Sequence, residues 1–202
     1  MNQTPEWRLV LSRDPVMAGI IAGKSDIVSS AHSDIYLNLI SSIISQQLST
    51  KVAAVIKTRF LNLFPDQYPH ADQVLTLTDE IMRSVGLSFQ KIKYIRNVAE
   101  FKATGQLEYE FINALPDEEL ITHLTQIKGV GRWTAEMILM FALDRLDVFP
   151  VLDLGIQNAI KRAYNLETAG KTLLAQMREI SENWRPYRTL ACKYLWRSLD
   201  NN

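Results

Sequence analysis

The sequence contains a single cysteine, Cys192, among its 202 residues. One thiol cannot form an internal disulfide, and it cannot supply the ligands of a thiolate zinc site or a four-cysteine iron–sulfur cluster. An excess of one charge sign is also lacking, because 22 Lys and Arg residues balance 22 Asp and Glu residues. A strongly basic surface for nucleic acid is therefore excluded, and any nucleic-acid contact must be local.

Long hydrophobic runs are absent as well. No apolar stretch reaches the length needed to span a membrane, and residues 1–15 carry charges where a secretory signal needs an apolar segment. We therefore expect an intracellular protein, in the cytoplasm or nucleoid of a bacterium or the nucleus of a eukaryote, without a membrane partner. The 47% hydrophobic content predicts a folded globular chain.

Strand-like alternation is almost missing, whereas helix signals recur along the chain. Apolar residues repeat at helical spacing after two capping residues: Leu37, Ile40, Ile44 and Leu48 after Asp34, and Val52, Val55, Ile56 and Phe60 after Ser49. Further helices are expected within residues 78–86, 88–105, 116–127, 134–141, 153–163, 168–183 and 186–198. The sequence predicts an all-α protein with short connections.

A Gly-x-Gly turn, Gly129-Val130-Gly131, separates two of these helices, and Val130 is expected to point into the core. We expect both glycines to serve the turn, because glycine tolerates positive φ and lets another group approach the backbone closely. The turn leads into a helix, whose free N–H groups form a site for anions such as phosphate. An ordinary helix–helix turn with a glycine cap explains the motif alone equally well.

Asp153 stands at the start of the next helix, after the rigid Phe149-Pro150 pair. The simpler interpretation is an N-cap, because helix starts favour Asp for structural reasons. The functional interpretation is a carboxylate held at the edge of a cleft.

Together the turn and the aspartate resemble the helix-hairpin-helix DNA glycosylase superfamily, and within it the alkylbase branch of 3-methyladenine DNA glycosylase II. The similar segments lie in the branch's order within residues 36–197: LISSIISQQLSTKVAAVIKTRF, VGLSFQKIKYIRNVA, IKGVGRWTAEMILMF, DVFPVLDLGIQNAI and WRPYRTLACKYLW. The chain departs from the branch at Leu152, where a second aspartate is common. Larger members also carry an N-terminal β domain, so a minimal, purely helical version is expected.

The resemblance implies a two-lobed helical bundle with a cleft between the lobes. One lobe would comprise residues 36–146, with the hairpin at about 118–141, and the other residues 1–35 together with 147–202. The protein would act on damaged duplex DNA as a monomer and would require no cofactor.

The resemblance also implies roles for individual residues. Asp153 would be the catalytic carboxylate, Trp133 and Tyr187 would line the base pocket, and Gln47 with Leu48 would form the wedge that fills the gap left by a flipped base. The DNA backbone would contact the N–H groups of Gly129, Gly131 and Thr134 and the side chains of Lys128 and Arg132, with Lys161 nearby. Main-chain carbonyls of Thr125, Ile127 and Val130 would hold a sodium or potassium ion. The structural alternatives are core packing for the two aromatic residues and a solvent-exposed turn for Gln47.

Trp133 stands where relatives that cut the DNA backbone carry a lysine, so the Schiff-base route is not available at this position. An indole instead attracts a cationic alkylated base. Such a base is already a good leaving group, so a single carboxylate that stabilises the sugar cation suffices. We expect a monofunctional glycosylase that releases alkylated purines such as 3-methyladenine and 7-methylguanine by base flipping and so initiates base excision repair. The alternatives are a non-catalytic helix-hairpin-helix DNA-binding module and a glycosylase for another lesion.

Overall fold

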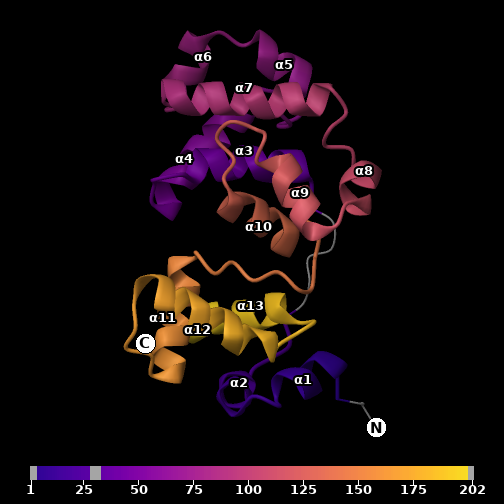
Figure 1. Ribbon diagram of the computed structural model, residues 1–202. Coiled ribbons are helices and arrows are strands. Elements are labelled where there is room, and N and C mark those ends of the chain that lie inside the picture. The colour runs from indigo at the N-terminus through magenta and orange to yellow at the C-terminus, as the bar shows by residue number, and fades with distance from the viewer. Residues whose placement is uncertain (1–3, 28–32, 200–202) are drawn as a thin grey trace. The chain divides into compact units, whose positions relative to one another are not determined.

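The chain folds into two helical units, shown in Figure 1 as a computed structural model that describes residues 4–27 and 33–199. Unit 1 comprises residues 1–30 and 139–202, and unit 2 comprises residues 31–138. Within the described ranges every regular element is an α-helix, so the predicted all-α class is confirmed. No helix in these ranges is long and apolar enough to cross a membrane.

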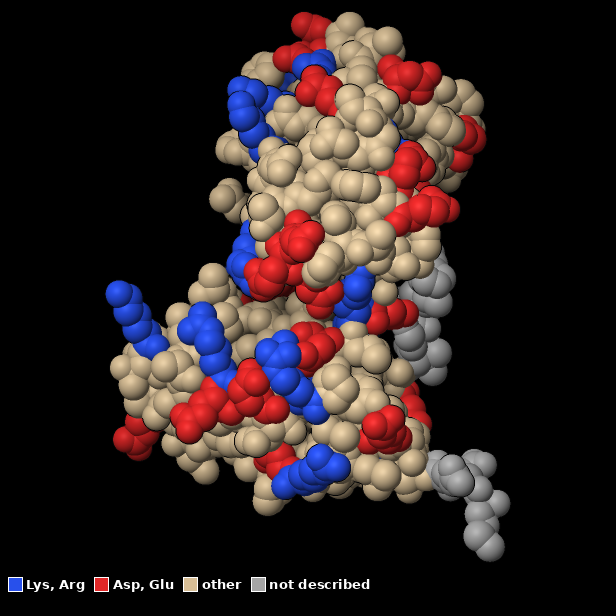
Figure 2. Space-filling view, turned by 45° about the vertical axis from the view of Figure 1, so that its right-hand side comes forward, with Lys and Arg blue, Asp and Glu red and all other residues tan. Residues whose placement is uncertain are grey.

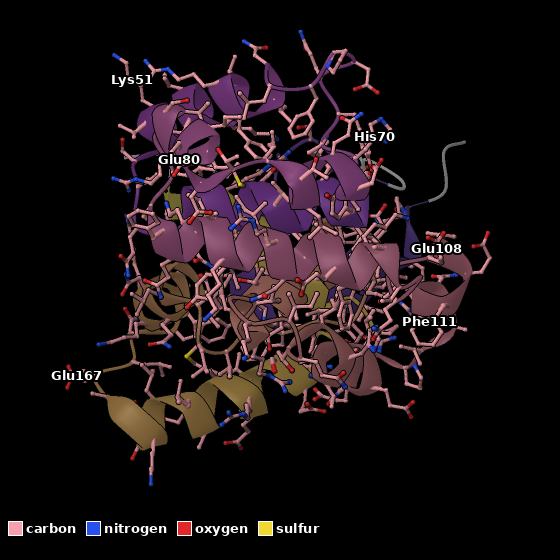
Figure 3. The ribbon with its side chains drawn as sticks, turned by 90° about the horizontal axis from the view of Figure 1, so that it is seen from above. Lys51, His70, Glu80, Glu108, Phe111 and Glu167 are labelled. Atoms are coloured by element: carbon pink, nitrogen blue, oxygen red, sulfur yellow. The ribbon has the colours of Figure 1, made fainter. Side chains whose placement is uncertain are left out.

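Unit 2 is built around α7, the longest of its helices. Its helices are α3 (Ile35–Ser45), α4 (Thr50–Leu61), α5 (Ala71–Thr76), α6 (Asp79–Ser84), α7 (Phe89–Ala103), α8 (Tyr109–Ala114) and α9 (Asp117–Leu124). Helices α3, α5 and α6 pack against α7, and α4 packs against α3. In Figure 3, α7 crosses the middle of the view, and Glu108 and Phe111 lie at the right-hand edge of the view. The core of the unit comes from α3 and α7, whose buried residues include Leu39, Ile43, Ile92 and Ile95.

Unit 1 joins the two ends of the chain. Its helices are α1 (Glu6–Leu11), α2 (Pro15–Ile21), α11 (Leu154–Tyr164), α12 (Gly170–Glu182) and α13 (Arg188–Leu199). Helix α13 packs against α11 and against α2. The buried carboxylate of Asp14 caps α2 by accepting hydrogen bonds from the N–H groups of Val16 (2.9 Å) and Met17 (3.2 Å). It also accepts hydrogen bonds from the Tyr164 hydroxyl and, at 3.0 Å, from the Trp184 indole, so one residue ties α2 to the distant part of the chain.

Helix α10 (Arg132–Phe141) spans the boundary between the units, which falls after Ile138. The boundaries expected from the sequence lay after residues 35 and 146, whereas the structure divides the chain after residues 30 and 138. The difference arises because the last turn of α10 and the loop after it pack with unit 1. The Phe141 ring stacks on Trp196, and the hydroxyl of Thr189 donates to the Arg145 carbonyl at 2.6 Å.

Two of the expected apolar patterns need correction. Leu48 lies beyond the end of α3 and is exposed, and Val52 and Val55 of α4 are each 45% exposed, while Phe60 is fully buried. Helical spacing identified the helices, but the buried face of α4 is narrower than its apolar pattern. The short helices α1, α2, α5 and α8 were not expected, because six or seven residues are too few to display a helical repeat.

Charged side chains of both signs are interspersed on the surface. Figure 2 shows basic and acidic side chains next to one another in the lower part of the view, and in the upper part acidic side chains along the right and basic ones mainly at the left. This mixture agrees with the zero net charge of the sequence and with nucleic-acid contacts that are local.

Candidate active site

Asp153 caps α11 and also carries a second hydrogen bond. Its Oδ1 atom accepts from the N–H of Ile156 at 2.8 Å and from the indole Nε1 of Trp196 at 3.0 Å. The predicted N-cap is therefore confirmed, and the carboxylate lies at the positive end of the helix, where a negative charge is stabilised. Two donors that converge on one oxygen restrain the orientation of the carboxylate beyond what a cap alone requires.

Trp196 is the functional candidate that sequence reasoning missed. Its ring stacks on Phe141 with centroids 5.8 Å apart, and the ammonium of Lys193 lies 5.1 Å from the centre of the Phe141 ring. The only sequence signal was its position at the end of the segment WRPYRTLACKYLW, because 43 residues separate it from Asp153. The aromatic pair Phe141 and Trp196 thus supports the carboxylate from the side chains of α10 and α13.

Gly155 makes the contact between Asp153 and Trp196 possible. A Cβ atom at this position would lie 3.0 Å from Oδ1 of Asp153 and 3.0 Å from Nε1 of Trp196. Both distances are shorter than ordinary carbon contacts, so a side chain would require the carboxylate or the indole to shift by a few tenths of an ångström. The residues on either side of Asp153 in the sequence, Leu152 and Leu154, are apolar and 56% and 73% exposed.

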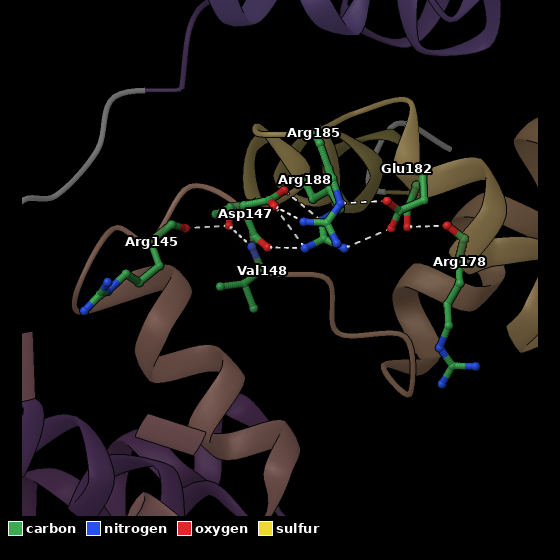
Figure 4. A network of polar contacts seen from close by, with 9 residues as sticks. Arg145, Asp147, Val148, Arg178, Glu182, Arg185 and Arg188 are labelled. Carbon is green, nitrogen blue, oxygen red and sulfur yellow. Dashed lines mark hydrogen bonds and ion pairs between the residues drawn. The ribbon is translucent and has the colours of Figure 1, made fainter. Parts of the chain in front are cut away.

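The loop that leads to Asp153 is fixed by charged and polar contacts with the start of α13 and with Arg185 just before it, shown in Figure 4. The guanidinium of Arg188 donates to the Asp147 carboxylate from Nε at 2.7 Å and to the Asp147 carbonyl from Nη2 at 2.7 Å. Arg185 pairs with the same carboxylate, and Glu182 pairs with both arginines. The Val148 N–H donates to the Thr189 hydroxyl at 3.0 Å. The loop is therefore held at several points before it reaches Asp153.

Tyr187, expected in the base pocket, lies in unit 1 just before α13. Burial and a hydrogen bond with the Glu6 carboxylate raise the pKa of its hydroxyl. The hydroxyl group is thus directed towards the start of α1. The role of the Tyr187 ring in the base pocket stays a prediction. Trp133 belongs to unit 2 and is 46% exposed, so the core-packing alternative for this residue is wrong.

The hairpin has the expected form, with α9, a turn and then α10. Leu120, Leu124, Ile127 and Val130 are buried, which confirms the apolar face and the inward direction of Val130. Gly129 has a φ of +103°, and a Cβ atom there would lie 2.3 Å from the Tyr94 ring.

The second glycine of the hairpin differs from the first. Gly131 lies outside the positive-φ region, and apart from its neighbours in the chain no atom lies within 4 Å of the position that its Cβ would take. The expected positive φ is therefore found at Gly129 and not at Gly131, and close approach of a DNA phosphate to Gly131 stays a prediction. The space at Gly131 leaves the start of α10 accessible, where first-turn N–H groups have no partner within the helix.

Arg132 is less available for DNA than its position suggested. It makes two hydrogen bonds with the Glu118 carboxylate, at 2.6 and 3.0 Å, and a third with the buried carboxylate of Glu136 at 3.0 Å. Hydrogen bonds from Arg132 hold the pKa of Glu118 below its usual value. Its charge is therefore balanced within unit 2, whereas the Lys128 side chain is exposed. Thr134 is buried in the first turn of α10.

The expected wedge lies in the turn between α3 and α4. Gln47 is exposed and has a φ of +58°, and Leu48 is 36% exposed. Residue 46 ends α3 and Ser49 caps α4, so the two side chains project between two helix ends. The solvent-exposed turn is therefore confirmed as a structural feature, and it presents a polar and an apolar side chain together.

The three carbonyls proposed as cation ligands lie in the hairpin turn. The Ile127 carbonyl accepts a hydrogen bond from the Val130 N–H at 2.9 Å and retains a second lone pair, and Thr125 ends α9. Carbonyl oxygens suit a hard monovalent cation, so the donor set fits the ion chemically. The described residues contain no group of three His, Cys, Asp or Glu side chains that could hold a metal ion.

Comparison with known proteins places these features in a family. Residues 40–186 match the HhH-GPD superfamily of base excision DNA repair proteins. The chain belongs to this superfamily. The match includes the hairpin, the turn at Gln47 and Leu48, and Asp153, whereas Tyr187 and Trp196 lie beyond its end.

Individual HhH-GPD relatives resemble the chain over most of its length. The DNA-3-methyladenine glycosylase 1 of Schizosaccharomyces pombe is 39% identical over 165 residues, which cover 81% of this chain and 72% of the relative. The solved structure of the S. pombe 3-methyladenine DNA glycosylase in complex with abasic DNA has a TM-score of 0.84 at 34% identity and covers 97% of each chain. The DNA-3-methyladenine glycosidase of Bacillus halodurans has a TM-score of 0.86 at 36% identity, covering 98% of this chain and 91% of the other.

Proposed function

We propose that the protein is a DNA glycosylase that hydrolyses the N-glycosidic bond of alkylated purines such as 3-methyladenine and 7-methylguanine. The observation that carries the proposal is the Asp153 carboxylate, fixed by Trp196 and by the start of α11 in a chain of the HhH-GPD superfamily. The names of its relatives support the substrate class, since they are 3-methyladenine DNA glycosylases.

In the proposed reaction Asp153 acts through its negative charge. As the bond between the base and C1′ of the sugar breaks, its electron pair stays on the base, whose positive charge is thereby neutralised. The sugar becomes cationic, and the nearby carboxylate stabilises that charge and orients a water molecule. The water oxygen bonds to C1′ and its proton passes to solvent, which leaves an abasic site. Trp196 is a positioning residue for the carboxylate in this scheme.

We propose Trp133 as the aromatic residue that stacks on the extruded base, with Tyr187 as a second member of the pocket. The exposed indole of Trp133 offers an electron-rich face, which attracts a cationic base more strongly than a neutral one. A glycosylase for another lesion remains the alternative substrate class. Competition between methylated and deaminated duplexes decides between them, and faster release of a deaminated base contradicts our proposal.

The hairpin is proposed to hold the DNA backbone. Amide N–H groups of Gly129, Gly131 and Thr134 point a partial positive charge at a phosphate, and exposed Lys128 adds a full charge nearby. The carbonyls of Thr125, Ile127 and Val130 would hold a sodium or potassium ion in the same turn. An ion there supplies positive charge close to the phosphate.

Gln47 and Leu48 are proposed to fill the stack when the damaged base leaves it. Extrusion of a base costs a few kcal/mol, and side chains inserted into the gap recover part of that cost. An exposed turn with an amide and an aliphatic side chain provides both hydrogen bonding to the unpaired base and stacking.

We propose that the product is an intact strand with an abasic site and that the monomer is the active form. The indole at position 133 cannot form a Schiff base, so borohydride is expected to trap no covalent adduct between protein and DNA. A trapped adduct would show that a lysine attacks the sugar and would overturn the monofunctional assignment.

The experiment that tests the function is incubation of the protein with methylated duplex DNA, followed by chromatography of the released bases. Release of 3-methyladenine or 7-methylguanine supports the proposal. Tight DNA binding without release of any base supports the alternative, a non-catalytic binding module. A carboxylate facing DNA speaks against that alternative, because it repels phosphate and contributes nothing to binding.

A further inference from the structure

The wedge turn and the hairpin turn are joined by one side chain of unit 2. The amide Nε2 of Gln46 donates to the carbonyl of Gly129 at 3.0 Å, across 83 residues of sequence. Gln46 is the residue that ends α3, and it directly precedes exposed Gln47. A single hydrogen bond therefore connects the residue before Gln47 to Gly129, the first glycine of the hairpin turn.

One face of α7 supports both turns. Lys91 donates from Nζ to the carbonyl of Ile44 at 2.7 Å, at the end of α3, and burial lowers the pKa of this lysine. Three residues later Tyr94 packs against Gly129, where a Cβ atom would meet its ring. Asn97, after three more residues, donates from Nδ2 to the carbonyl of Lys128 at 3.3 Å. The spacing of three places all of these side chains on one side of the helix.

These contacts set the direction of the hairpin amides. In a planar trans peptide the N–H points opposite to the C=O. Asn97 holds the Lys128 carbonyl, so the N–H of Gly129 in the same peptide points away from α7. Gln46 holds the next carbonyl, that of Gly129. Two successive peptide planes of the turn are thus fixed by side chains, one of which comes from the base of the wedge.

We propose that Gln46 is a positioning residue that couples the wedge to the phosphate-binding hairpin. Its hydrogen bond fixes the distance and direction between Gln47 and the Gly129 amide, so the wedge enters the base stack in register with the phosphate that the hairpin holds. The inference rests on the proposed function, because it needs a DNA with a flipped or missing base. Gln46 itself need not touch the DNA.

The coupling predicts a selective loss of affinity. Binding to intact duplex uses the hairpin and little of the wedge, whereas binding to an abasic duplex uses both at a fixed separation. Without the hydrogen bond the wedge turn must be ordered on the DNA, which weakens binding only where the wedge is inserted.

The test is Gln46→Met, which keeps the length of the side chain and removes the donor. We expect affinity for abasic duplex, measured by fluorescence anisotropy, to fall about tenfold, and affinity for intact duplex to change by less than about twofold. A 2-aminopurine placed opposite the abasic site is expected to report a less rigid partner base. The matched control is Gln176→Met in α12 of unit 1, which removes the hydrogen bond that the Thr168 hydroxyl donates to the side chain of Gln176 and for which both affinities are expected to stay unchanged.

A double-mutant cycle separates coupling from a simple contact. Once Gln46→Met is present, Gln47→Ala is expected to cost little further affinity for abasic duplex, because the wedge is already out of register. Fully additive losses, or an equal loss on both duplexes, overturn the proposal. Thermal melting checks that each variant folds. If Gln46→Met does not fold, Gln46→Glu takes its place, because it also lacks the amide donor. Its added charge weakens binding to both duplexes alike, so the ratio of the two affinities is expected to change as for Gln46→Met.

Failure of the coupling and failure of the proposed function give different results. If the parent protein binds abasic and intact duplex equally, the wedge and the coupling both fail. If the parent prefers the abasic duplex and Gln46→Met keeps that preference, the wedge stands and only the coupling is refuted.

Discussion

At the scale of single residues, Asp153 has an observed structural role and a proposed chemical role. Its carboxylate caps α11 and accepts the Trp196 indole, and both contacts use Oδ1. A capping aspartate can be replaced by asparagine with little loss of helix stability, because the amide oxygen still accepts the backbone N–H. The negative charge cannot be replaced in this way, so the two roles can be separated by one substitution.

We predict that Asp153→Asn abolishes base release while it preserves folding and DNA binding. Loss of the charge that stabilises the sugar cation should lower the rate by at least about 10²-fold, whereas the melting temperature should change little. The measurement is single-turnover release of 3-methyladenine, with calorimetry of both proteins. Unchanged release by the variant excludes Asp153 from the mechanism, and a collapsed melting transition would mean that the cap is its main role.

Trp196→Phe tests the positioning of the carboxylate. Phenylalanine keeps an aromatic ring to stack on Phe141 but has no N–H for Oδ1 of Asp153. We expect kcat to fall about tenfold, corresponding to one hydrogen bond to a charged group, with KM nearly unchanged. Trp7→Phe is the control, since Trp7 stacks on Tyr194 and is not part of the site. A change in KM alone would indicate a role in substrate binding instead.

The sequence predicted the N-cap at Asp153, because a cap depends on local spacing, and the catalytic role of this residue stays a prediction. It did not predict Trp196, whose importance depends on a contact across 43 residues, or the ion pairs that occupy Arg132. Such pairings are decided by the packing of helices, which no local pattern records.

At the scale of elements, the hairpin shows how two similar glycines differ. Gly129 adopts a positive φ against the Tyr94 ring, whereas Gly131 has free space around it. One glycine is needed for the fold of the turn, and the other leaves the start of α10 accessible. The pair offers a clean separation of stability from DNA binding.

We predict that Gly129→Ala lowers the free energy of unfolding by at least about 2 kcal/mol, because a Cβ at positive φ is strained and meets the Tyr94 ring. Gly131→Ala should leave stability within about 0.5 kcal/mol and weaken binding to every DNA sequence alike, because phosphate contacts carry no sequence information. Urea denaturation and anisotropy titrations measure the two effects. If Gly131→Ala binds DNA as well as the parent, the hairpin is only a helix connection.

Long helices were predictable from their caps and apolar repeats, as in α7 and α11, where Ser88 and Asp153 cap the first turn. The exposure of Val52 and Val55 on α4 could not be predicted, because the apolar pattern identifies a face of the helix but not the element that covers it. Helix α2 carried a signal in Asp14-Pro15, a cap followed by a proline in the first turn.

At the scale of the whole molecule, Asp14 joins distant parts of unit 1. Burial alone would raise the pKa of this carboxyl, but hydrogen bonds from Tyr164, Trp184 and two backbone amides outweigh it and hold the pKa below its ordinary value. A carboxyl whose pKa is lower in the folded state stabilises the protein above its unfolded pKa, near pH 4, and that contribution disappears as the pH falls further.

We predict that Asp14→Asn lowers the free energy of unfolding at pH 7 by about 1–3 kcal/mol, because an amide nitrogen would face donors that now meet an oxygen. The difference between parent and variant should be constant from about pH 7 to pH 5 and should narrow below about pH 4. Chemical denaturation across this range provides the measurement, with Asp72→Asn, an exposed residue of α5, as the control. A difference that stays constant down to pH 3 contradicts the assignment.

The division of the chain into units has a consequence for synthesis on the ribosome. Unit 2 is one continuous segment, so it can fold as soon as it has emerged, whereas unit 1 needs both ends of the chain. The hydrogen bond between Asp14 and Trp184 cannot form until Trp184, 170 residues later, has been synthesised. Synthesis of that segment takes about 10–30 s at ordinary translation rates. During that interval the apolar residues Leu11, Met17 and Ile21 have no core to enter. The apolar residues of the first two helices are therefore expected to stay exposed until the C-terminal helices have been synthesised.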